Sequence, residues 1–595
     1  MKIQIASVSP RVHLADPRAN ADEIIKLACE AADGGASIVA FPELAVTGYS
    51  CGDLFLQDTL ISAAKDAVDR IVSASADISA VIVFGAPVME DEELFSCALV
   101  AAGGSLLGTF YKTWNCDDMG LVESRYFSAE NDSLEPDGTE IGVTIPGTGE
   151  TVTMAVIMGD VDSISGFDGD IVVNISEGAE YAGRLPLRLG KVRECSTGCI
   201  YVLSGCGFGE STTDFVYTGI KAIAQGGRLL AKGCARHKVM IMAEADTADI
   251  EESRAITACS GPNSRGNADP RIPYLPDTSE HTLEHAFDLQ ARGLLGRMEA
   301  IGCRKAVIGI SGGLDSTLAL LVTVRAFELA GYDRSDITAV TMPCFGTSET
   351  TRSFALSLMS ELGVTYREVD IRASVMQHLA DIGHDPDVHN TAFENAQARE
   401  RTQVLMDLAN DLNAIVVGTG DMSEIALGWC TYNGDHMSMY GVNCGVPKTL
   451  VRMIVRYVAD TCGSEKLSQL LYSILDIPVS PELIPGEDGA IGQKTEDILG
   501  PYEIHDFILY YAMVSHMGPK QIYGLAAEVF GSSYSDDVIR MTVRNFYRRF
   551  FSSQFKRSCS PDGPMILSFS LSPRGGLMMP SDVSGRIWKA EAEEL

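Results

Sequence analysis

The sequence predicts an α/β protein with two large parts, and three observations support this prediction. Short apolar runs with a strand pattern alternate with helical stretches in both halves of the chain. A stretch rich in Ser, Pro, Gly and Asn at residues 251–280 separates the halves. The length of 595 residues, with 46% apolar and 21% charged residues, is typical of a globular chain that buries more than one core.

In the first half, apolar runs predict the strands. They are KIQIASV, SIVAFPEL, AVIVFGAPV, TVTMAVIM, DIVVNIS and CIYVLSG, and a helix is expected at residues 21–34. The uncharged run from Ser96 to Tyr111 is interrupted by Gly103 and Gly104, which predicts a β-hairpin. No run reaches the roughly 20 apolar residues that a membrane helix needs.

The second half begins with a predicted helix at residues 281–301 and the strand KAVIGIS. Strand and helix then alternate through TLALLVTVRAFELA, ITAVTMP, TTRSFALSLMSELG, REVDI and AIVVGTG, which predicts a parallel sheet covered by helices on both faces. From about Pro481 the sequence is mostly helical. These patterns divide the chain into residues 1–250, a linker at 251–283 and residues 284–595.

The charge and the cysteines exclude several classes of protein. With 46 basic and 80 acidic residues, the chain has a formal net charge of −34, whereas nucleic-acid and anionic-membrane proteins carry basic surfaces. The 15 cysteines show no paired spacing, so neither a zinc site nor a disulfide framework is expected. The first residues, MKIQIASVSP, have a strand pattern and not that of a signal peptide, so we expect a cytoplasmic protein.

The sharpest motif is Ser311-Gly312-Gly313-Leu314-Asp315-Ser316, between an apolar strand and a helix. Two glycines let backbone N–H groups approach an anion, and the helix N-terminus adds its positive end. The two serine hydroxyls can donate to phosphate oxygens, and Asp315 can bind Mg²⁺. The alternative is a plain strand-to-helix turn. The motif resembles the loop of N-type ATP pyrophosphatases, which split ATP between the α and β phosphates.

Five further segments follow in order: residues 393–401 (FENAQARER), 418–424 (GTGDMSE), 429–432 (WCTY), 445–449 (GVPKT) and 553–557 (SQFKR). Together with the loop, they resemble the synthetase domain of glutamine-dependent NAD⁺ synthetases over residues 284–588. The resemblance implies a doubly wound parallel sheet with a helical C-terminal extension, and homo-oligomers. It implies amidation of deamido-NAD to NAD⁺ through an adenylated intermediate, with release of AMP and pyrophosphate.

The resemblance also implies a role for each matching residue. ATP would contact Gly309, Ile310, Ser311, Gly312, Gly313, Leu314, Asp315, Ser316 and Thr419. Mg²⁺ would be bound by Asp315 and Glu424. Deamido-NAD would contact Asn395, Arg399, Glu424, Trp429, Cys430, Thr431, Tyr432, Asp435, Lys448 and Lys556. Taken in isolation, Arg399 and Arg401 are more typical of a solvated helix face, and Glu424 alone could be a charge favoured at a helix N-terminus.

Residues 2–248 are similar to the carbon–nitrogen hydrolase (nitrilase) family, which implies an αββα sandwich. The amidases of that family use a Glu–Lys–Cys triad, in which the cysteine attacks the amide carbonyl. The glutamate matches Glu43 in Phe-Pro-Glu, and the lysine matches Lys112 in Tyr-Lys-Thr. The cysteine should follow the strand TMAVIM, but Met158 stands there, and a thioether cannot become a thiolate.

Asp118 also stands where the family has a glutamine-contacting tyrosine, and Gly159 follows Met158. We therefore expect an amidase half that is inactive toward glutamine and a synthetase half that uses free ammonia. The alternative is full glutamine dependence with an unusual amidase site, for which Cys116 is the candidate nucleophile. Two more distant alternatives are an ATP-pyrophosphatase amidotransferase with another substrate and a non-catalytic scaffold. A stand-alone nitrilase is disfavoured because its cysteine is missing.

Overall fold

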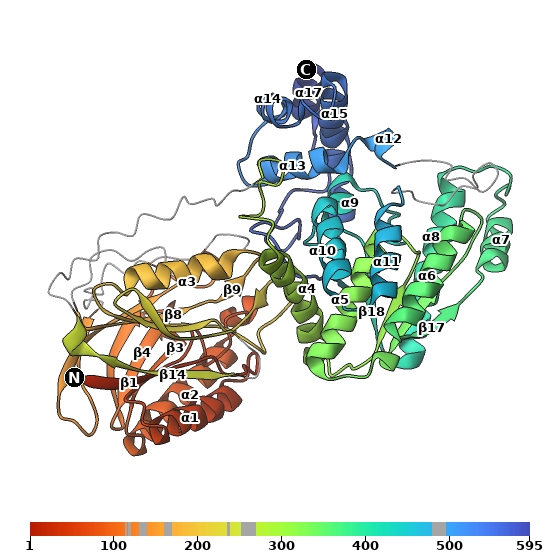
Figure 1. The fold of residues 1–595 in the computed structure, drawn as a ribbon. Coiled ribbons are helices and arrows are strands. Elements are labelled where there is room, and N and C mark those ends of the chain that lie inside the picture. Colours follow the sequence, from red (N-terminus) through yellow and green to blue (C-terminus); the bar gives the residue numbers. More distant parts are fainter. Residues whose placement is uncertain are drawn as a thin grey trace. The chain divides into compact units, whose positions relative to one another are not determined.

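The computed structural model describes residues 1–113, 116, 121–129, 140–159, 169–234, 238–250, 269–478 and 495–595. The chain divides into two compact units, both of α/β architecture (Figure 1). The first unit comprises Met1–Glu180, Arg184–Ser211 and Val216–Ser264. The second comprises Tyr181–Gly183, Thr212–Phe215 and Arg265–Leu595.

The first unit contains two six-stranded sheets. The strands of one are β1 (Lys2–Val8), β2 (Ile38–Ala40), β3 (Val81–Glu90), β4 (Glu93–Ala102), β5 (Ser105–Tyr111) and β14 (Met240–Asp246). The strands of the other are β6 (Glu140–Thr144), β7 (Thr151–Met158), β8 (Ile171–Ser176), β10 (Ile200–Gly205), β12 (Lys221–Gln225) and β13 (Arg228–Gly233). Their orders are β14-β1-β2-β3-β4-β5 and β13-β12-β10-β8-β7-β6. A separate pair consists of β9 (Ala179–Glu180) and β11 (Val216–Tyr217).

Apolar clusters hold these sheets in four layers. The helices α1 (Pro17–Asp33) and α2 (Asp58–Ala74) pack on the first sheet, and α3 (Arg184–Cys195) packs on the second. Between the sheets lies a third cluster built from alternate residues of both, such as Ile5 and Val156. This arrangement confirms the αββα sandwich. The predicted β-hairpin is confirmed as β4 and β5. Helix α1 begins earlier than predicted because Asp16 caps it and Pro17 suits its first position.

The sheet of the second unit is parallel throughout, as predicted. Its strands are β15 (Ala306–Gly309), β16 (Ile337–Thr341), β17 (Thr365–Glu368), β18 (Ile415–Gly418) and β19 (Tyr440–Gly441). In the order β17-β16-β15-β18-β19, β16 and β17 are added on one side of β15, and β18 and β19 on the other. The strand order therefore reverses between β15 and β18. Ligands of open α/β sheets bind at such a switch point, outside the carboxyl ends of the strands. The loops after β15 and β18 are therefore the expected place for a site.

The helices around this sheet are α4 (Glu280–Ala300), α5 (Leu314–Ala330), α6 (Glu349–Leu362), α7 (Arg372–Asp381), α8 (Thr391–Leu412), α9 (Met422–Leu427), α10 (Lys448–Thr461) and α11 (Glu465–Leu475). The C-terminal extension is helical, as predicted, with α12 (Thr495–Leu499), α13 (Tyr502–Met513), α14 (Pro519–Phe530), α15 (Asp536–Ser552), α16 (Gln554–Arg557) and α17 (Arg586–Glu593). Helix α13 packs against α9 and α10, and α15 and α16 pack against α9. The extension thus supports the elements that follow β18.

Part of the predicted linker, residues 251–268, lies outside the described residues. Helix α4 begins at Glu280, where the Ser279 hydroxyl accepts a hydrogen bond from the Thr282 N–H. The boundaries 1–250, 251–283 and 284–595 stay predictions, as do the cytoplasmic location and the homo-oligomeric state. Every cysteine in the described ranges is free of a disulfide. No helix in those ranges is long and apolar enough to cross a membrane.

Burial of His505 in α13 predicts a loss of stability in acid. Burial lowers the pKa of this imidazole from 6.5 to about 4, so between these pH values the unfolded chain takes up a proton that the folded chain refuses. The free energy of unfolding should therefore fall with falling pH, by about 2 kcal/mol at pH 5 from this group.

The variant His505→Gln keeps a donor for the Leu499 carbonyl and cannot titrate. Urea unfolding of the wild type and this variant at pH 7.5 and pH 5 measures the effect. We expect the variant to gain on the wild type as the pH falls. An equal stability difference at both pH values would contradict the prediction.

Candidate active site

The loop between β15 and α5 has the form of an anion site. The Ser311 N–H donates to the Ser316 Oγ (3.3 Å), and the Gly313 N–H donates to the Ser311 Oγ (3.2 Å), so the loop is closed on itself. No side chain caps the N-terminus of α5, where Gly313 is the capping residue. Free N–H groups and the positive end of a 17-residue helix therefore remain for an anion.

The fold requires glycine at position 312. Gly312 has φ = +87°, and a Cβ at this position would lie 2.1 Å from the Thr351 carbonyl oxygen of α6. We expect Gly312→Ala to displace the loop, to lower the free energy of unfolding by about 1–3 kcal/mol, and to weaken ATP binding strongly. ATP titration followed by calorimetry, with urea unfolding alongside, measures both. Gly331→Ala is the matched control, because Gly331 has φ = +68° at the far end of α5 and nothing near its Cβ position.

A buried lysine and three carboxylates lie beside this loop. The Lys448 Nζ is 2.7 Å from Asp315 Oδ2, 2.8 Å from Asp421 Oδ2 and 2.9 Å from Glu424 Oε1. The side chains of Lys448 and Asp421 are 1% and 0% exposed. The Nζ also lies 5.2 Å from the centre of the Tyr502 ring. The first residues of α5, α9 and α10 thus meet in one charged cluster.

The cluster places three carboxyl groups around one ammonium group. Burial raises the pKa of Asp421 to about 7 and holds that of Glu424 well above its ordinary value. Burial also lowers the pKa of Lys448, but the surrounding carboxylates outweigh it and keep the pKa well above the ordinary value. A cation bound among these three carboxyl groups would stabilise their ionised forms.

The donor set fits a magnesium ion. One carboxylate oxygen each from Asp315, Asp421 and Glu424 lie within 4.8 Å of one another. The Asp315 Oδ1 is buried and makes no hydrogen bond. Carboxylate oxygens are the ligands that Mg²⁺ prefers, and it binds through few of them together with phosphate oxygens. The sequence predicted Asp315 and Glu424 as ligands, and Asp421 is the third residue of this set.

Asn443 connects the two loops at the switch point. Its Nδ2 donates to the carbonyl oxygens of Asp315 (2.9 Å) and Thr419 (3.0 Å), and its own Oδ1 accepts from Gln290 (3.0 Å). Both Asn443 and Gln290 are fully buried. The predicted ATP residue Thr419 is therefore tied to the phosphate loop through a residue that the sequence did not single out.

The predicted deamido-NAD residues also lie together. The Thr431 hydroxyl donates to Asn395 (2.9 Å), and the Thr431 N–H donates to Asp435 (2.8 Å). The Arg399 Nε donates to the Tyr432 carbonyl oxygen (3.2 Å), which links α8 to the segment after α9. Because of this contact, Arg399 is not simply part of a solvated helix face.

Basic residues of α15 and α16 also contact this segment. The Lys556 Nζ donates to the carbonyl oxygens of Gly428 (2.7 Å) and Cys430 (2.6 Å). The guanidinium of Arg549 lies 4.7 Å from the centre of the Trp429 ring. The predicted lysine is thus next to the predicted WCTY segment and fixes its backbone.

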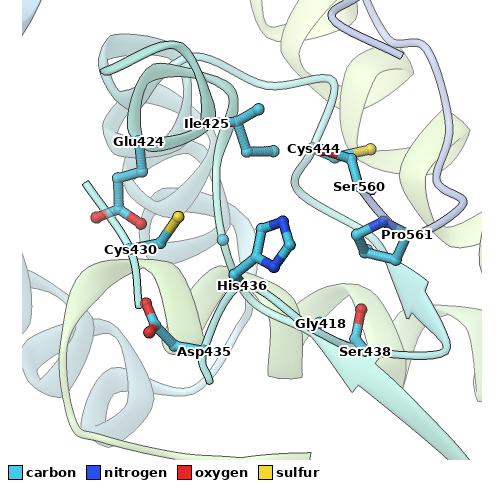
Figure 2. A pocket seen from close by; sticks show the side chains of 12 residues that line it. Gly418, Glu424, Ile425, Cys430, Asp435, His436, Ser438, Cys444, Ser560 and Pro561 are labelled. Atoms are coloured by element: carbon cyan, nitrogen blue, oxygen red, sulfur yellow. The ribbon is translucent and has the colours of Figure 1, made fainter. Parts of the chain in front are cut away.

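A pocket joins these groups (Figure 2). Glu424, Cys430 and Asp435 lie along one side of it in the view, His436 lies centrally, and Pro561 lies opposite. The remaining lining residues are Gly418, Gly420, Ile425, Ser438, Gly441, Cys444 and Ser560. The pocket therefore connects the charged cluster to the predicted deamido-NAD residues, at the carboxyl ends of β18 and β19.

The first unit contains a second buried cluster. The Lys112 Nζ donates to Glu43 Oε1 (2.8 Å) and to Glu123 Oε1 (2.9 Å). Glu43 also accepts from the Ser96 hydroxyl (2.9 Å), and Glu123 accepts from the Tyr49 hydroxyl. Burial raises the pKa of Glu43 to about 7. The predicted glutamate and lysine are thus in contact, and Glu123 is a partner that the sequence did not single out.

Met158 ends β7, and its side chain lies in the apolar cluster between the two sheets. No ionisable sulfur is supplied by this position. Cys116, the alternative nucleophile, is buried, and its backbone N–H donates to Glu123 Oε2 (2.6 Å). Asp118 lies outside the described residues.

Comparisons with known proteins match both units. The family described as carbon-nitrogen hydrolase matches residues 4–160, and the family described as NAD synthase matches residues 290–558. A protein of Mycobacterium leprae (strain TN) named glutamine-dependent NAD(+) synthetase is 34% identical, with 99% of this chain and 98% of that protein aligned. The chain belongs to the glutamine-dependent NAD⁺ synthetase family. The relatives carry the name synthetase, and NAD⁺ synthetases are ligases.

A second relative agrees with this assignment, and a solved structure agrees with the fold. The protein of the same name from Mycobacterium tuberculosis (strain ATCC 25618 / H37Rv) is 34% identical, with 98% of this chain and 97% of that protein aligned. The crystal structure of a glutamine-dependent NAD(+) synthetase from Cytophaga hutchinsonii has a TM-score of 0.78 at 18% identity and covers 100% of both chains. That similarity shows that the two proteins share a fold.

Proposed function

We propose that this NAD⁺ synthetase family member forms NAD⁺ from deamido-NAD, ATP and ammonia. The observation that supports the proposal is the convergence of sequence-distant motifs at one switch point. Lys448 pairs with Asp315 of the phosphate loop and with Glu424, and Glu424 lines one pocket of the second unit together with Cys430 of the segment 428–432. No single motif would justify the reaction, but an anion loop, a cation site and a ligand pocket in contact are what adenylation requires.

The chemistry explains why these groups are needed. A carboxylate resists attack by ammonia because it is anionic and has no good leaving group. Its oxygen attacks the α-phosphorus of ATP, the bond between the α-phosphorus and the bridging oxygen breaks, and pyrophosphate leaves. Ammonia then attacks the carbonyl carbon of the mixed anhydride, the nitrogen loses a proton to solvent, and AMP leaves with the electrons of the broken carbon–oxygen bond.

The residues of the second unit have distinct tasks in this proposal. The loop N–H groups and the hydroxyls of Ser311 and Ser316 bind phosphate oxygens. Lys448 stabilises negative charge that develops on them, at a position fixed in advance by its carboxylate partners. Asp315, Asp421 and Glu424 would hold Mg²⁺, which when bound neutralises charge on the departing pyrophosphate. Asn395, Asp435 and the WCTY segment orient the deamido-NAD.

We further propose that the amidase half does not supply ammonia from glutamine. Acyl transfer in nitrilase-type sites needs a thiolate, and the position that should carry it is Met158 in an apolar environment. The pair of Glu43 and Lys112 remains, so the first unit keeps a charged core without its nucleophile. This half would then serve as a structural partner of the synthetase half.

The test is NAD⁺ formation from deamido-NAD, ATP and Mg²⁺, with either glutamine or ammonium chloride as nitrogen donor. We expect activity with ammonium and at most about 1% of that rate with glutamine, because loss of a nucleophile removes several orders of magnitude in rate. Comparable rates with both donors would contradict the loss of glutaminase. Inactivity with both donors would contradict the synthetase proposal itself.

One observation favours a second candidate, a fully glutamine-dependent enzyme. Lys112 and Glu43 are 2.8 Å apart, as a working amidase would need, and the relatives are named glutamine-dependent. In that case another thiol must attack, and Cys116 is the candidate closest in sequence to Lys112. Cys116→Ala would then abolish the glutamine-dependent rate and leave the ammonium-dependent rate unchanged.

A further inference from the structure

Helix α13 of the C-terminal extension inserts a buried carboxylate between the two short segments that carry the charged cluster. Asp506 is 1% exposed. Its Oδ1 accepts a hydrogen bond from the Ser423 hydroxyl in α9. Its Oδ2 accepts from the Thr449 N–H (2.9 Å) and from the Thr449 hydroxyl (2.6 Å) in α10.

Each residue that Asp506 binds is the sequence neighbour of a cluster residue. Ser423 precedes Glu424, and Thr449 follows Lys448. The Ser423 hydroxyl, which donates to Asp506, also accepts from the Lys448 N–H (2.8 Å). One chain of hydrogen bonds therefore connects α13, α9 and α10 directly behind the contact between Glu424 and Lys448.

The first turn of α10 needs this carboxylate. Pro447, the capping residue of α10, has no side-chain donor or acceptor and makes no capping bond. The Thr449 N–H is one of the orphan donors of the helix, and Asp506 satisfies it from another helix. Negative charge is also favoured at a helix N-terminus. Asp506 thus supplies from α13 the cap that the sequence of α10 lacks.

We propose that Asp506 is a positioning residue for the synthetase reaction, which holds α9 and α10 in register so that Glu424 and Lys448 meet the phosphates and Mg²⁺ in a fixed arrangement. The Asp506 carboxylate is buried, and its hydrogen bonds go to residues beside the cluster and not to the cluster itself. It acts through Ser423 and Thr449. The inference rests on the proposed synthesis of NAD⁺.

Asp506→Asn tests the inference because it keeps the volume and changes the bonding. The carboxylate accepts three hydrogen bonds, whereas an amide turns an NH₂ donor toward Ser423 or Thr449. A displacement of about 1 Å in reacting groups costs up to about 100-fold in rate. We expect kcat with ammonium to fall 10- to 100-fold, the KM for deamido-NAD to change less than about threefold, and the Mg²⁺ concentration for half-maximal thermal stabilisation to rise.

The matched control is His505→Gln, the preceding residue on the same helix. His505 is equally buried, but its hydrogen bond goes to the Leu499 carbonyl oxygen of α12 and not to a residue of α9 or α10. We expect it to change thermal stability without changing kcat. Ser423→Ala is the second variant, and it serves as the test if Asp506→Asn does not fold. It breaks the same chain of hydrogen bonds by the loss of one hydroxyl, so it should also lower kcat.

The wild type in the same assay separates the proposed synthesis of NAD⁺ from the proposed positioning role of Asp506. If the wild type forms no NAD⁺, the proposed function fails. If the wild type forms NAD⁺ and folded Asp506→Asn or Ser423→Ala keeps its kcat and its Mg²⁺ response, the positioning role is overturned. A loss of thermal stability equal to that of His505→Gln, with unchanged kcat, would likewise overturn it.

Discussion

Lys448→Met is expected to lower the free energy of unfolding of the second unit by about 3–5 kcal/mol at pH 7.5 and to abolish NAD⁺ formation. Lys448 is 1% exposed and is the ammonium partner of Asp315, Asp421 and Glu424. The methionine fills a similar volume but leaves buried carboxylates without this compensating charge. The cost is therefore the desolvation of uncompensated charge, which exceeds the value of the lost contacts.

Mg²⁺ provides an internal check on this result. In the variant, a divalent cation would be the main positive charge among the three carboxylates, so added Mg²⁺ should raise the melting temperature more in Lys448→Met than in the wild type. Calorimetric scans with and without Mg²⁺ measure this difference. An equal Mg²⁺ response of both proteins would contradict the assignment of this cluster as the metal site.

Lys466→Met is the matched control for the same substitution in the same unit. Lys466 is 79% exposed and pairs with Glu361 at 2.7 Å on the surface. Surface ion pairs contribute at most about 1 kcal/mol, so this variant should unfold almost like the wild type. If Lys448→Met is no less stable than Lys466→Met, the buried cluster does not carry the charge that we describe.

The fold was predictable because periodicity and glycine punctuation are local signals. The alternation of apolar runs predicted the parallel sheet, and the glycines at 103 and 104 predicted the hairpin of β4 and β5. The start of α1 was less predictable. The Asp16 side chain accepts a capping hydrogen bond and Pro17 has a fixed φ, and both extend the helix beyond its apolar pattern.

The candidate site was predictable in part, where a motif itself carries the chemistry. Asp421 stands three residues before Glu424 in the segment 418–424. That spacing from the predicted ligand Glu424 was the only sequence signal that Asp421 belongs to the same set of carboxylates. Asn443 and Asp506 had no such signal. Their importance arises from contacts with residues 24 to 128 positions away in the chain, which no local pattern records.

Lys112→Met is expected to destabilise the first unit by about 3–5 kcal/mol while leaving the ammonium-dependent rate per folded molecule unchanged. The Lys112 side chain is 2% exposed, and its two partners, Glu43 and Glu123, are 0% and 6% exposed. Without the ammonium, two buried carboxylates face each other. If the first unit is only a structural partner, this cost appears in unfolding and in hydrogen exchange of β3 to β5, and not in catalysis.

The destabilisation should depend on pH with a defined sign. Burial already raises the pKa of Glu43 to about 7, and Lys112 is the main group that lowers it, so its removal raises the folded-state pKa further. The folded chain then binds a proton that the unfolded chain has released, and its stability falls as the pH rises above about 4.5. Lys112→Met should accordingly lose more stability at pH 8.5 than at pH 6.

Two further variants test whether uncompensated charge causes the loss of stability. The triple variant Lys112→Met, Glu43→Gln, Glu123→Gln removes all three charges and should recover most of the lost stability, because no uncompensated carboxylate remains. Lys2→Met is the matched control, since Lys2 pairs with Glu244 on the surface and is 70% exposed. A stable Lys112→Met protein that loses a glutamine-dependent rate would instead identify Lys112 as a catalytic residue and the first unit as a working amidase.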